Sequence, residues 1–277
     1  MVAIALALAS GLLWGCADFG GGSLSRRAPV LAVSALSQGA GFVALLAGLA
    51  VVGHVDWASF RFGLVAGIGG GAGLALFYLA LSIGTMSIVA PIAACSALVP
   101  FSLALARGER PSALALAGAG LALVGIVAAS AEERRAETAA RGRAIPIAVG
   151  AALGFGVFAY FLGRGGQAGS AYSTLLGARV VSFGLLATAV AVARPRLRVP
   201  APTLGLVVAV GIADLSANAL FALAAGRGLL AIVSVLGSVY PLSTVLLAHA
   251  IHGERITRTQ KLGVLVALAG VAAVSAG

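Results

Sequence analysis

The chain carries one segment twice, and this duplication constrains its fold more than any single residue does. Residues 84–128 and residues 228–274 each hold an apolar run with a proline, then Gly-Glu-Arg, then a second apolar run. The Gly-Glu-Arg units occupy 108–110 and 253–255. An internal repeat of this length in an apolar chain is typical of membrane proteins that are built from two related halves.

The outer surface of the chain is predicted to face lipid. Apolar residues make up 61% of the 277 residues and charged residues only 9%, whereas soluble proteins carry about 25% charged residues. Lipid offers the backbone no hydrogen bonds, so only helices and closed barrels can cross it. The apolar runs are about 20 residues long and do not alternate with polar residues, which favours helices. The fold class is therefore expected to be an all-α polytopic membrane protein.

Ten membrane-spanning helices are predicted, and short connections join them. The longest connection, 131–143, holds seven charges in thirteen residues, so it cannot enter lipid. We interpret it as a charged linker between two five-helix units, residues 1–130 and residues 144–277. The expected helices are 2–22, 30–52, 63–83, 86–106, 112–130, 144–163, 170–192, 203–224, 229–250 and 260–276.

The two units are expected to cross the membrane in opposite senses. The repeat extends beyond the duplicated segment, because residues 76–80 align with 220–224 and Trp14-Gly15 aligns with Phe155-Gly156. Five crossings are an odd number, so the second unit must begin on the opposite face from the first. The units are then inverted repeats about an axis in the membrane plane, an arrangement that gives a carrier two exchangeable conformations.

Glycines recur at four-residue spacing in three of the predicted spans. Small residues at this spacing let helix backbones approach closely, which matters where no hydrophobic effect drives helices together. These glycines are therefore predicted to mark close helix contacts. They are Gly11 and Gly15 in the first span, Gly63, Gly67 and Gly71 in the third, and Gly150 and Gly154 in the sixth.

The basic residues divide unequally between the two faces of the membrane. The net charge is +10, but the basic residues stand singly or in pairs between apolar runs, which fits membrane-surface loops and argues against nucleic acid as a partner. One face carries twelve of them, and the other face, which holds both termini, carries five. The positive-inside rule places the twelve in the cytoplasm and both termini outside it. The five are Arg61, Arg107, Arg110, Arg164 and Arg227.

Three features of the sequence form a distinctive combination. They are ten predicted spans in two repeats, Trp14-Gly15 in the first span, and a Gly-Glu-Arg unit after spans four and nine. This combination resembles the EamA family of the drug/metabolite transporter superfamily, and the resemblance covers nearly the whole chain. It implies a bacterial inner-membrane carrier that exports amino acids, drugs or other small metabolites. It also implies a central cavity lined by both repeats, with spans five and ten more peripheral. The chain departs from strict repeat symmetry at Pro100, which lies about one turn from the residue that aligns with Pro241.

Three charged side chains fall inside predicted spans, while the other 23 of the 26 lie in loops or at span ends. The three are Asp18, Arg179 and Asp214. A charge at mid-bilayer costs about 2.5–3.5 kcal/mol on the more lenient insertion scale, so each is expected to face the bundle interior and to have a partner. Arg179 and Asp214 lie near the middles of neighbouring spans and are predicted to pair. Asp18 is the second candidate partner for Arg179.

These charged groups are hypothesised to line a polar substrate-binding cavity. Arg179 can grip a carboxylate, and Asp214 or Asp18 can bind an amine or exchange a proton. Asn218 follows Asp214 by one helical turn on the same helix face, and Gln38 aligns with Arg179 in the repeat. The alternative is a buried ion pair that only fixes helix register, with Gln38 forming an ordinary interhelical hydrogen bond.

Prolines interrupt the two spans that align with each other. Pro91 and Pro100 lie in span four and Pro241 lies in span nine. A proline inside a helix removes a backbone donor and tends to kink the helix. Broken helices in corresponding spans are typical of a transport path, so these prolines are candidate gating residues, the alternative being packing relief alone. Tyr240 and Trp14 are candidate cavity walls, the alternative being membrane anchors or core residues.

The function that these patterns favour is secondary transport of small polar metabolites by alternating access. The expected partners are a small-molecule substrate and the lipid bilayer, with protons as a candidate coupling ion. No Walker motif indicates ATP coupling, and the three histidines show no metal spacing, so no cofactor and no metal are expected. The Gly-Glu-Arg units are expected to stabilise helix starts rather than to bind substrate.

Two other classes of function remain as alternatives. A polytopic membrane enzyme acting on lipid head groups usually needs several carboxylates or histidines near the interface, and the eight acidic residues of this chain form no such cluster in the sequence. A channel or a non-transporting scaffold is disfavoured by the inverted duplication, which serves alternating access. No catalytic residue is therefore predicted.

Overall fold

The computed structural model describes residues 1–25, 28–83, 89, 92–130, 138–194, 199–253 and 256–277, and the regular structure of these residues is helical. The first half contains α1 (Val2–Ser25), α2 (Val30–Val52), α3 (Trp57–Ile83), the 3-10 turn η1 (Cys95–Ala97), α5 (Leu98–Ala106) and α6 (Ala113–Ser130). The second half contains α7 (Thr138–Gln167), α8 (Ala171–Ala193), the 3-10 turn η2 (Ala201–Thr203), α9 (Leu204–Ala225), α10 (Leu230–Gly237), α11 (Tyr240–His252) and α12 (Arg258–Ala276).

Nine segments of the described residues are long and apolar enough to cross a membrane. One of them, Leu230–His252, combines α10 and α11, and a tenth apolar helix, Ile92–Ala106, is shorter. The predicted fourth span, 86–106, begins partly outside the described residues. The all-helical prediction is confirmed for the described part of the chain, and the count of ten spans stays a prediction.

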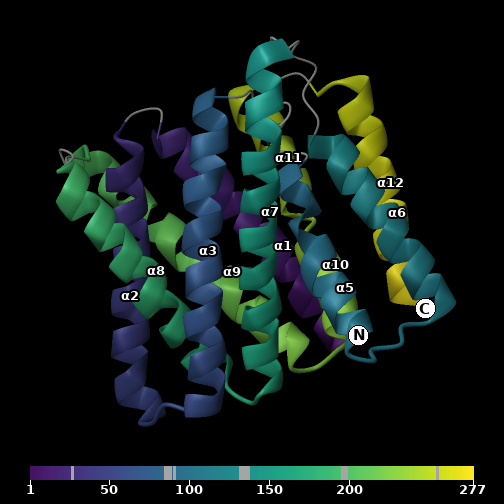
Figure 1. The fold of residues 1–277 in the computed structure, drawn as a ribbon, viewed down its shortest axis with the longest axis horizontal. Helices are drawn as coiled ribbons and strands as arrows, with labels where there is room; N and C mark the ends of the chain where they lie inside the picture. The colour runs from purple at the N-terminus through teal and green to yellow at the C-terminus, as the bar shows by residue number, and fades with distance from the viewer. Residues whose placement is uncertain (26–27, 84–88, 90–91, 131–137, 195–198, 254–255) are drawn as a thin grey trace.

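Helices of the first half lie against helices of the second half throughout the bundle. α3 packs against α7 and α8, while α1 and α2 pack against α9. α6 and α12 pack on each other at one edge of the bundle (Figure 1). Both chain termini lie at the same end of the bundle, the lower end in Figure 1, where Met1 and Gly277 border a shared cavity. The two halves therefore interlock rather than fold as separate domains.

α6 and α12 approach closely through glycines that align in the repeat. A Cβ at Gly125 would lie 2.7 Å from the carbonyl oxygen of Gly263, and a Cβ at Gly270 would lie 2.6 Å from the carbonyl oxygen of Gly118. In the alignment of the two halves Gly118 corresponds to Gly263, and Gly125 corresponds to Gly270. Each half therefore presents the same glycines to the other, and a side chain at either contact would force the helices apart.

A second kind of close helix contact also occurs twice. α1 lies close to span nine, and α7 lies close to span four. A Cβ at Gly15 of α1 would lie 2.5 Å from the carbonyl oxygen of Tyr240 in α11. A Cβ at Gly156 of α7 would lie 2.7 Å from the carbonyl oxygen of Ser96 in η1. Gly15 aligns with Gly156, and Tyr240 aligns with Ser96. The first span therefore packs on the ninth as the sixth packs on the fourth.

Helix α3 begins at Trp57, six residues before the predicted start at residue 63. The Asp56 carboxylate accepts a hydrogen bond from the backbone N–H of Ser59 (2.9 Å), which is the arrangement of a helix N-cap. This hydrogen bonding stabilises the charged form and holds the pKa of Asp56 below its usual value of 3.8. The helix starts earlier than predicted because Asp56 caps it, so the stretch up to Arg61 is helical.

The linker is shorter in the structure than the sequence predicted. α7 begins at Thr138, so residues 138–143, the last part of the predicted linker 131–143, extend this helix. The apolar part that could cross the membrane begins at Ala144, as expected. Residues 131–137 lie outside the described residues.

Candidate functional site

The predicted ion pair between Arg179 and Asp214 is present in the bundle interior. Arg179 lies in the middle of α8 and is 6% exposed. One nitrogen of its guanidinium group donates a hydrogen bond to Asp214 Oδ2 of α9 over 2.8 Å. The Asp214 side chain remains 30% exposed. The pair therefore joins a buried cation to a partly exposed carboxylate. Asp18, the second candidate partner, forms no ion pair with Arg179 within the described residues.

Gly41 of α2 lies close to both of the neighbouring helices at this pair. A Cβ at Gly41 of α2 would lie 3.4 Å from the carbonyl oxygen of Gly211 and 3.7 Å from Arg179 Cζ. Gln38 lies one turn before Gly41, so it lies on the same side of α2. Helices α2, α8 and α9 thus converge at the ion pair, and Gln38 is carried to the same region.

Two buried oxygen atoms in this region have no hydrogen-bond partner among the described residues. They are Gln38 Oε1 and Asn218 Oδ1. The Asn218 amide nitrogen donates to the backbone oxygen of Asp214 over 2.6 Å, so the orientation of the Asn218 side chain is fixed. Buried acceptors are normally paired, and unpaired ones cost roughly 1–3 kcal/mol each. Both acceptors can therefore take a further hydrogen-bond donor.

Asp18 of α1 and Tyr240 of α11 belong to two further helices that border this region. Gly11, Gly15 and Asp18 follow one face of α1, and on this face Gly15 packs against α11 at Tyr240. Asp18 is exposed on this face, and α1 packs against both α9 and α11. We use the name polar cluster for Asp18, Gln38, Arg179, Asp214, Asn218 and Tyr240.

Trp14 lies in an aromatic contact between helices. Its ring centroid is 5.4 Å from that of Phe221 in α9, and a Cβ at Gly237 of α10 would lie 3.6 Å from the Trp14 ring. The aligned residues make a similar contact, since Phe155 and Phe77 have ring centroids 5.9 Å apart. These contacts make Trp14 a core residue, and its role as a cavity wall stays a prediction.

The candidate gating prolines lie where the structure interrupts its helices, as far as they are described. Span nine breaks between α10 and α11, and Pro241 is the second residue of α11. Span four contains the 3-10 turn η1, and Pro100 follows in the first turn of α5. A proline is tolerated in the first turn of a helix because its missing N–H has no partner there. Pro91 lies outside the described residues.

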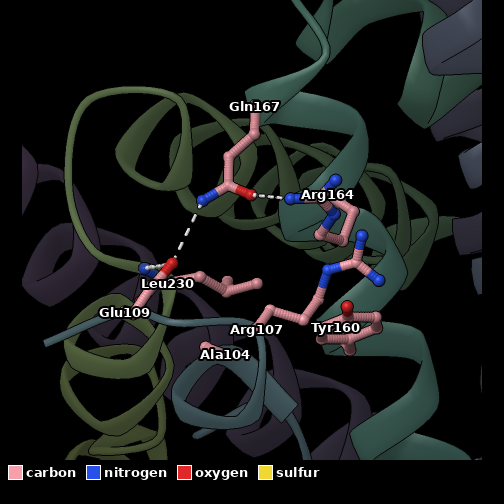
Figure 2. Close-up of a pocket in the computed structure, with 7 residues that line it drawn as sticks. All are labelled: Ala104, Arg107, Glu109, Tyr160, Arg164, Gln167 and Leu230. Carbon is pink, nitrogen blue, oxygen red and sulfur yellow. Dashed lines mark hydrogen bonds between the residues drawn. The ribbon is translucent and has the colours of Figure 1, made fainter.

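A separate cavity contains functional groups that were not predicted from the sequence. It measures about 260 Å³ and lies at the end of the bundle that holds the termini. Figure 2 shows Glu109, Gln167 and Arg164 linked around its rim. The lining residues are Ala104, Arg107, Glu109, Tyr160, Arg164, Gln167 and Leu230. Their signal in the sequence is weak, because arginines at span ends are expected in any membrane protein.

Glu109 confirms the expectation that a Gly-Glu-Arg unit stabilises a helix start. Its two carboxylate oxygens accept hydrogen bonds from the backbone N–H groups of Leu230 and Ala231, each over 2.9 Å. These are the first residues of α10, where the helix dipole favours a negative charge. The helix that Glu109 caps belongs to the other half of the chain, whereas α6 is the helix that follows Glu109 in the sequence. Glu254 of the second unit lies outside the described residues.

Comparison with known proteins supplies the classification. The profile of the EamA-like transporter family matches the chain twice, over residues 1–131 and again over residues 142–276. The chain belongs to the EamA-like transporter family. A solved structure described only as "Crystal structure of protein" resembles this fold with a TM-score of 0.81 at 18% identity, covering 99% of this chain and 97% of that one. No curated protein sequence matches the chain.

Membership of the EamA-like family agrees with the apolar helices, and together they identify a multi-pass membrane protein of a transporter family. The similarity to the solved structure supports the fold but does not identify a substrate. Within the described residues no group of three or more His, Cys, Asp or Glu side chains could hold a metal ion. The assignment of a substrate site must therefore rest on the polar groups of this chain.

Proposed function

We propose that this EamA-like protein is a secondary transporter of small polar metabolites in the bacterial inner membrane, and that the polar cluster is its substrate site. The observation that carries this proposal is the Arg179–Asp214 ion pair, with its arginine 6% exposed and its carboxylate 30% exposed. A charged pair in a membrane span is costly. An accessible carboxylate lets a solute exchange contacts with the pair, whereas a purely structural pair has no need of access.

The chemistry of the polar cluster fits a solute that carries both an anionic and a donor group. Arg179 can hold a carboxylate through its planar guanidinium group. An ammonium group can bind Asp214 or Asp18 and donate to the unpaired oxygens of Gln38 and Asn218. Amino acids and small amines with a carboxylate have this combination. No observation in the described residues favours the alternative of an enzyme acting on lipid head groups.

Many carriers achieve alternating access with two inverted repeats, which we place at residues 1–130 and 144–277. Three pairs of contacts support this arrangement, because each contact recurs when its residues are exchanged for the aligned residues of the other half. An isologous two-fold relation has this property. The pairs are Gly125–Gly263 with Gly270–Gly118, Gly15–Tyr240 with Gly156–Ser96, and Trp14–Phe221 with Phe155–Phe77.

Hydrogen bonds join the two halves at the end of the bundle that holds the termini. The Ser170 N–H donates to Ser59 Oγ over 3.1 Å, and the Asp56 N–H donates to Ser173 Oγ over 3.0 Å. Glu109 adds its bonds to the start of α10. In the proposed cycle these contacts close this end of the bundle, and they break when the protein opens to the other side. The interruptions at Pro100 and Pro241 let the ends of spans four and nine move.

Flux measured in proteoliposomes tests the transport proposal. The full chain is reconstituted and offered a panel of labelled amino acids, amines and small carboxylates, with empty liposomes as the baseline. We expect saturable flux of at least one compound that carries both charges. An imposed pH gradient should change this flux, and Asp18→Asn should lose that response if Asp18 exchanges the proton. Turnover of a lipid without solute flux would contradict the proposal.

The proposed topology makes a separate prediction. Reporters fused after Gly277 and before Met1 should lie on the same face of the membrane, because ten crossings are an even number. The charge count places this face outside the cytoplasm. Paired alkaline phosphatase and fluorescent protein fusions measure this directly. Termini on opposite faces would imply an odd number of crossings and would remove the inverted repeat.

A further inference from the structure

The cavity at the end of the bundle that holds the termini is enclosed by three helices that do not form the polar cluster. Ala104 and Arg107 come from the end of α5, Tyr160, Arg164 and Gln167 from α7, and Leu230 from the start of α10. The polar cluster instead lies on α1, α2, α8, α9 and α11. The two sites therefore use different side chains and can be tested separately.

The charges that line this cavity do not balance. Arg107 and Arg164 bring two positive charges, and Glu109 brings one negative charge. Both oxygens of Glu109 are already bound to the first N–H groups of α10, over 2.9 Å each. The positive end of a helix dipole is equivalent to about half a charge, so it takes up part of the Glu109 charge. The cavity is left with an excess of positive charge.

Neither arginine forms an ion pair with a carboxylate in the described part of the chain. Arg164 donates to the side-chain oxygen of Gln167 over 2.8 Å, and its Cζ lies 5.8 Å from the centroid of the Phe62 ring. Both contacts orient the guanidinium group without neutralising it. The Arg107 side chain is exposed, so its guanidinium group is open to a ligand. In Figure 2 both guanidinium groups lie on the same side of the cavity as the Tyr160 hydroxyl, and Glu109 lies on the opposite side. Gln167 lies between them, bonded to Arg164 and to Glu109.

We propose that this cavity binds a small oxyanion, a carboxylate or a phosphate group, between Arg107 and Arg164. Guanidinium groups bind such anions through paired, charge-assisted hydrogen bonds. The Tyr160 hydroxyl supplies a further donor, and the Gln167 side chain keeps Arg164 in place. The volume of about 260 Å³ accommodates one small anion or one lipid head group. The anion is either a solute or the phosphate of an anionic lipid at the membrane surface.

Binding of inorganic phosphate to the full chain in nanodiscs tests this proposal. The nanodiscs are made of neutral phosphatidylcholine, phosphate replaces chloride at constant ionic strength, and the unfolding temperature is followed. We expect saturable stabilisation of the native sequence. Arg107→Gln and Arg164→Gln should each weaken apparent affinity roughly tenfold or more, the worth of one charge-assisted hydrogen bond. Arg110→Gln is the matched control, because Arg110 is exposed on the same loop and does not line the cavity.

The lipid content of the nanodiscs distinguishes the two sources of the anion. If phosphate has no effect but phosphatidylglycerol stabilises the native protein more than Arg107→Gln, the bound oxyanion is a lipid phosphate and the site is upheld. If neither responds, or if all variants respond equally, the proposal is wrong and the effect is a general ion effect. Arg164→Gln also loses its bond to Gln167, so a folding defect there leaves Arg107→Gln as the deciding variant. Solute flux through the polar cluster is measured separately and does not enter this test.

Discussion

Replacing both members of the Arg179–Asp214 pair by apolar residues is expected to preserve the fold and abolish transport. In Arg179→Met/Asp214→Leu no buried charge is left without a partner, and such replacements are often neutral or stabilising. A bound solute would lose one charge-assisted hydrogen bond per group, and each is worth about 1.5–3 kcal/mol. Each loss should lower the apparent affinity for the transported solute roughly 10- to 150-fold. Proteoliposome flux and the unfolding temperature are measured on the same preparations.

A single variant separates the structural role of the pair from its role in transport. Asp214→Leu alone leaves the charge of Arg179 without a partner, and Arg179 is only 6% exposed. Removing one partner of a buried ion pair costs about 3–5 kcal/mol of stability. We therefore expect it to lower stability more than the double variant does. Thr188→Val is the control, because Thr188 is an exposed residue of α8, the helix of Arg179, and its hydroxyl donates to the Gly184 backbone oxygen. A double variant that transports like the native protein would make the pair a structural element only.

The sequence predicted this pair because the membrane leaves so few choices. Only Asp18, Arg179 and Asp214 fall inside predicted spans, and a charge in lipid needs a partner. Neighbouring spans made Arg179 and Asp214 the first choice, and the structure contains that pair. The sequence could not show that Gln38 and Asn218 keep unpaired oxygens, because hydrogen-bond satisfaction depends on how three helices converge.

The cavity around Arg107 and Arg164 was missed for a physical reason. Arginines at span ends are common in membrane proteins whether or not they bind anything. These two lie 57 positions apart in the sequence, and only the packing of α5, α7 and α10 brings them into one cavity. The role of Glu109 was predicted, but its target was not, because the sequence does not reveal that its carboxylate reaches the other half of the chain.

Glycines at the contact between α6 and α12 give the second large prediction. Gly125→Val and Gly270→Val should destabilise the protein by similar amounts, of about 1–3 kcal/mol each or more, because a side chain there must push the facing backbone away. A Cβ at Gly125 would lie 2.7 Å from a carbonyl oxygen of the partner helix, and a Cβ at Gly270 would lie 2.6 Å from one. Gly120→Val is the matched control on α6, since a Cβ at Gly120 meets nothing within 4 Å.

Equal penalties at Gly125 and Gly270 are expected if the two halves are repeats related by a two-fold axis, as the proposed inverted repeat requires. The two residues lie 145 positions apart, and they have equivalent surroundings only if one half faces the other through a two-fold relation. Unfolding temperatures in nanodiscs compare the three variants under one condition. If Val is tolerated at one glycine and not at its counterpart, the halves do not meet symmetrically. The exchange of conformations between the halves, on which alternating access depends, would then lose its structural basis.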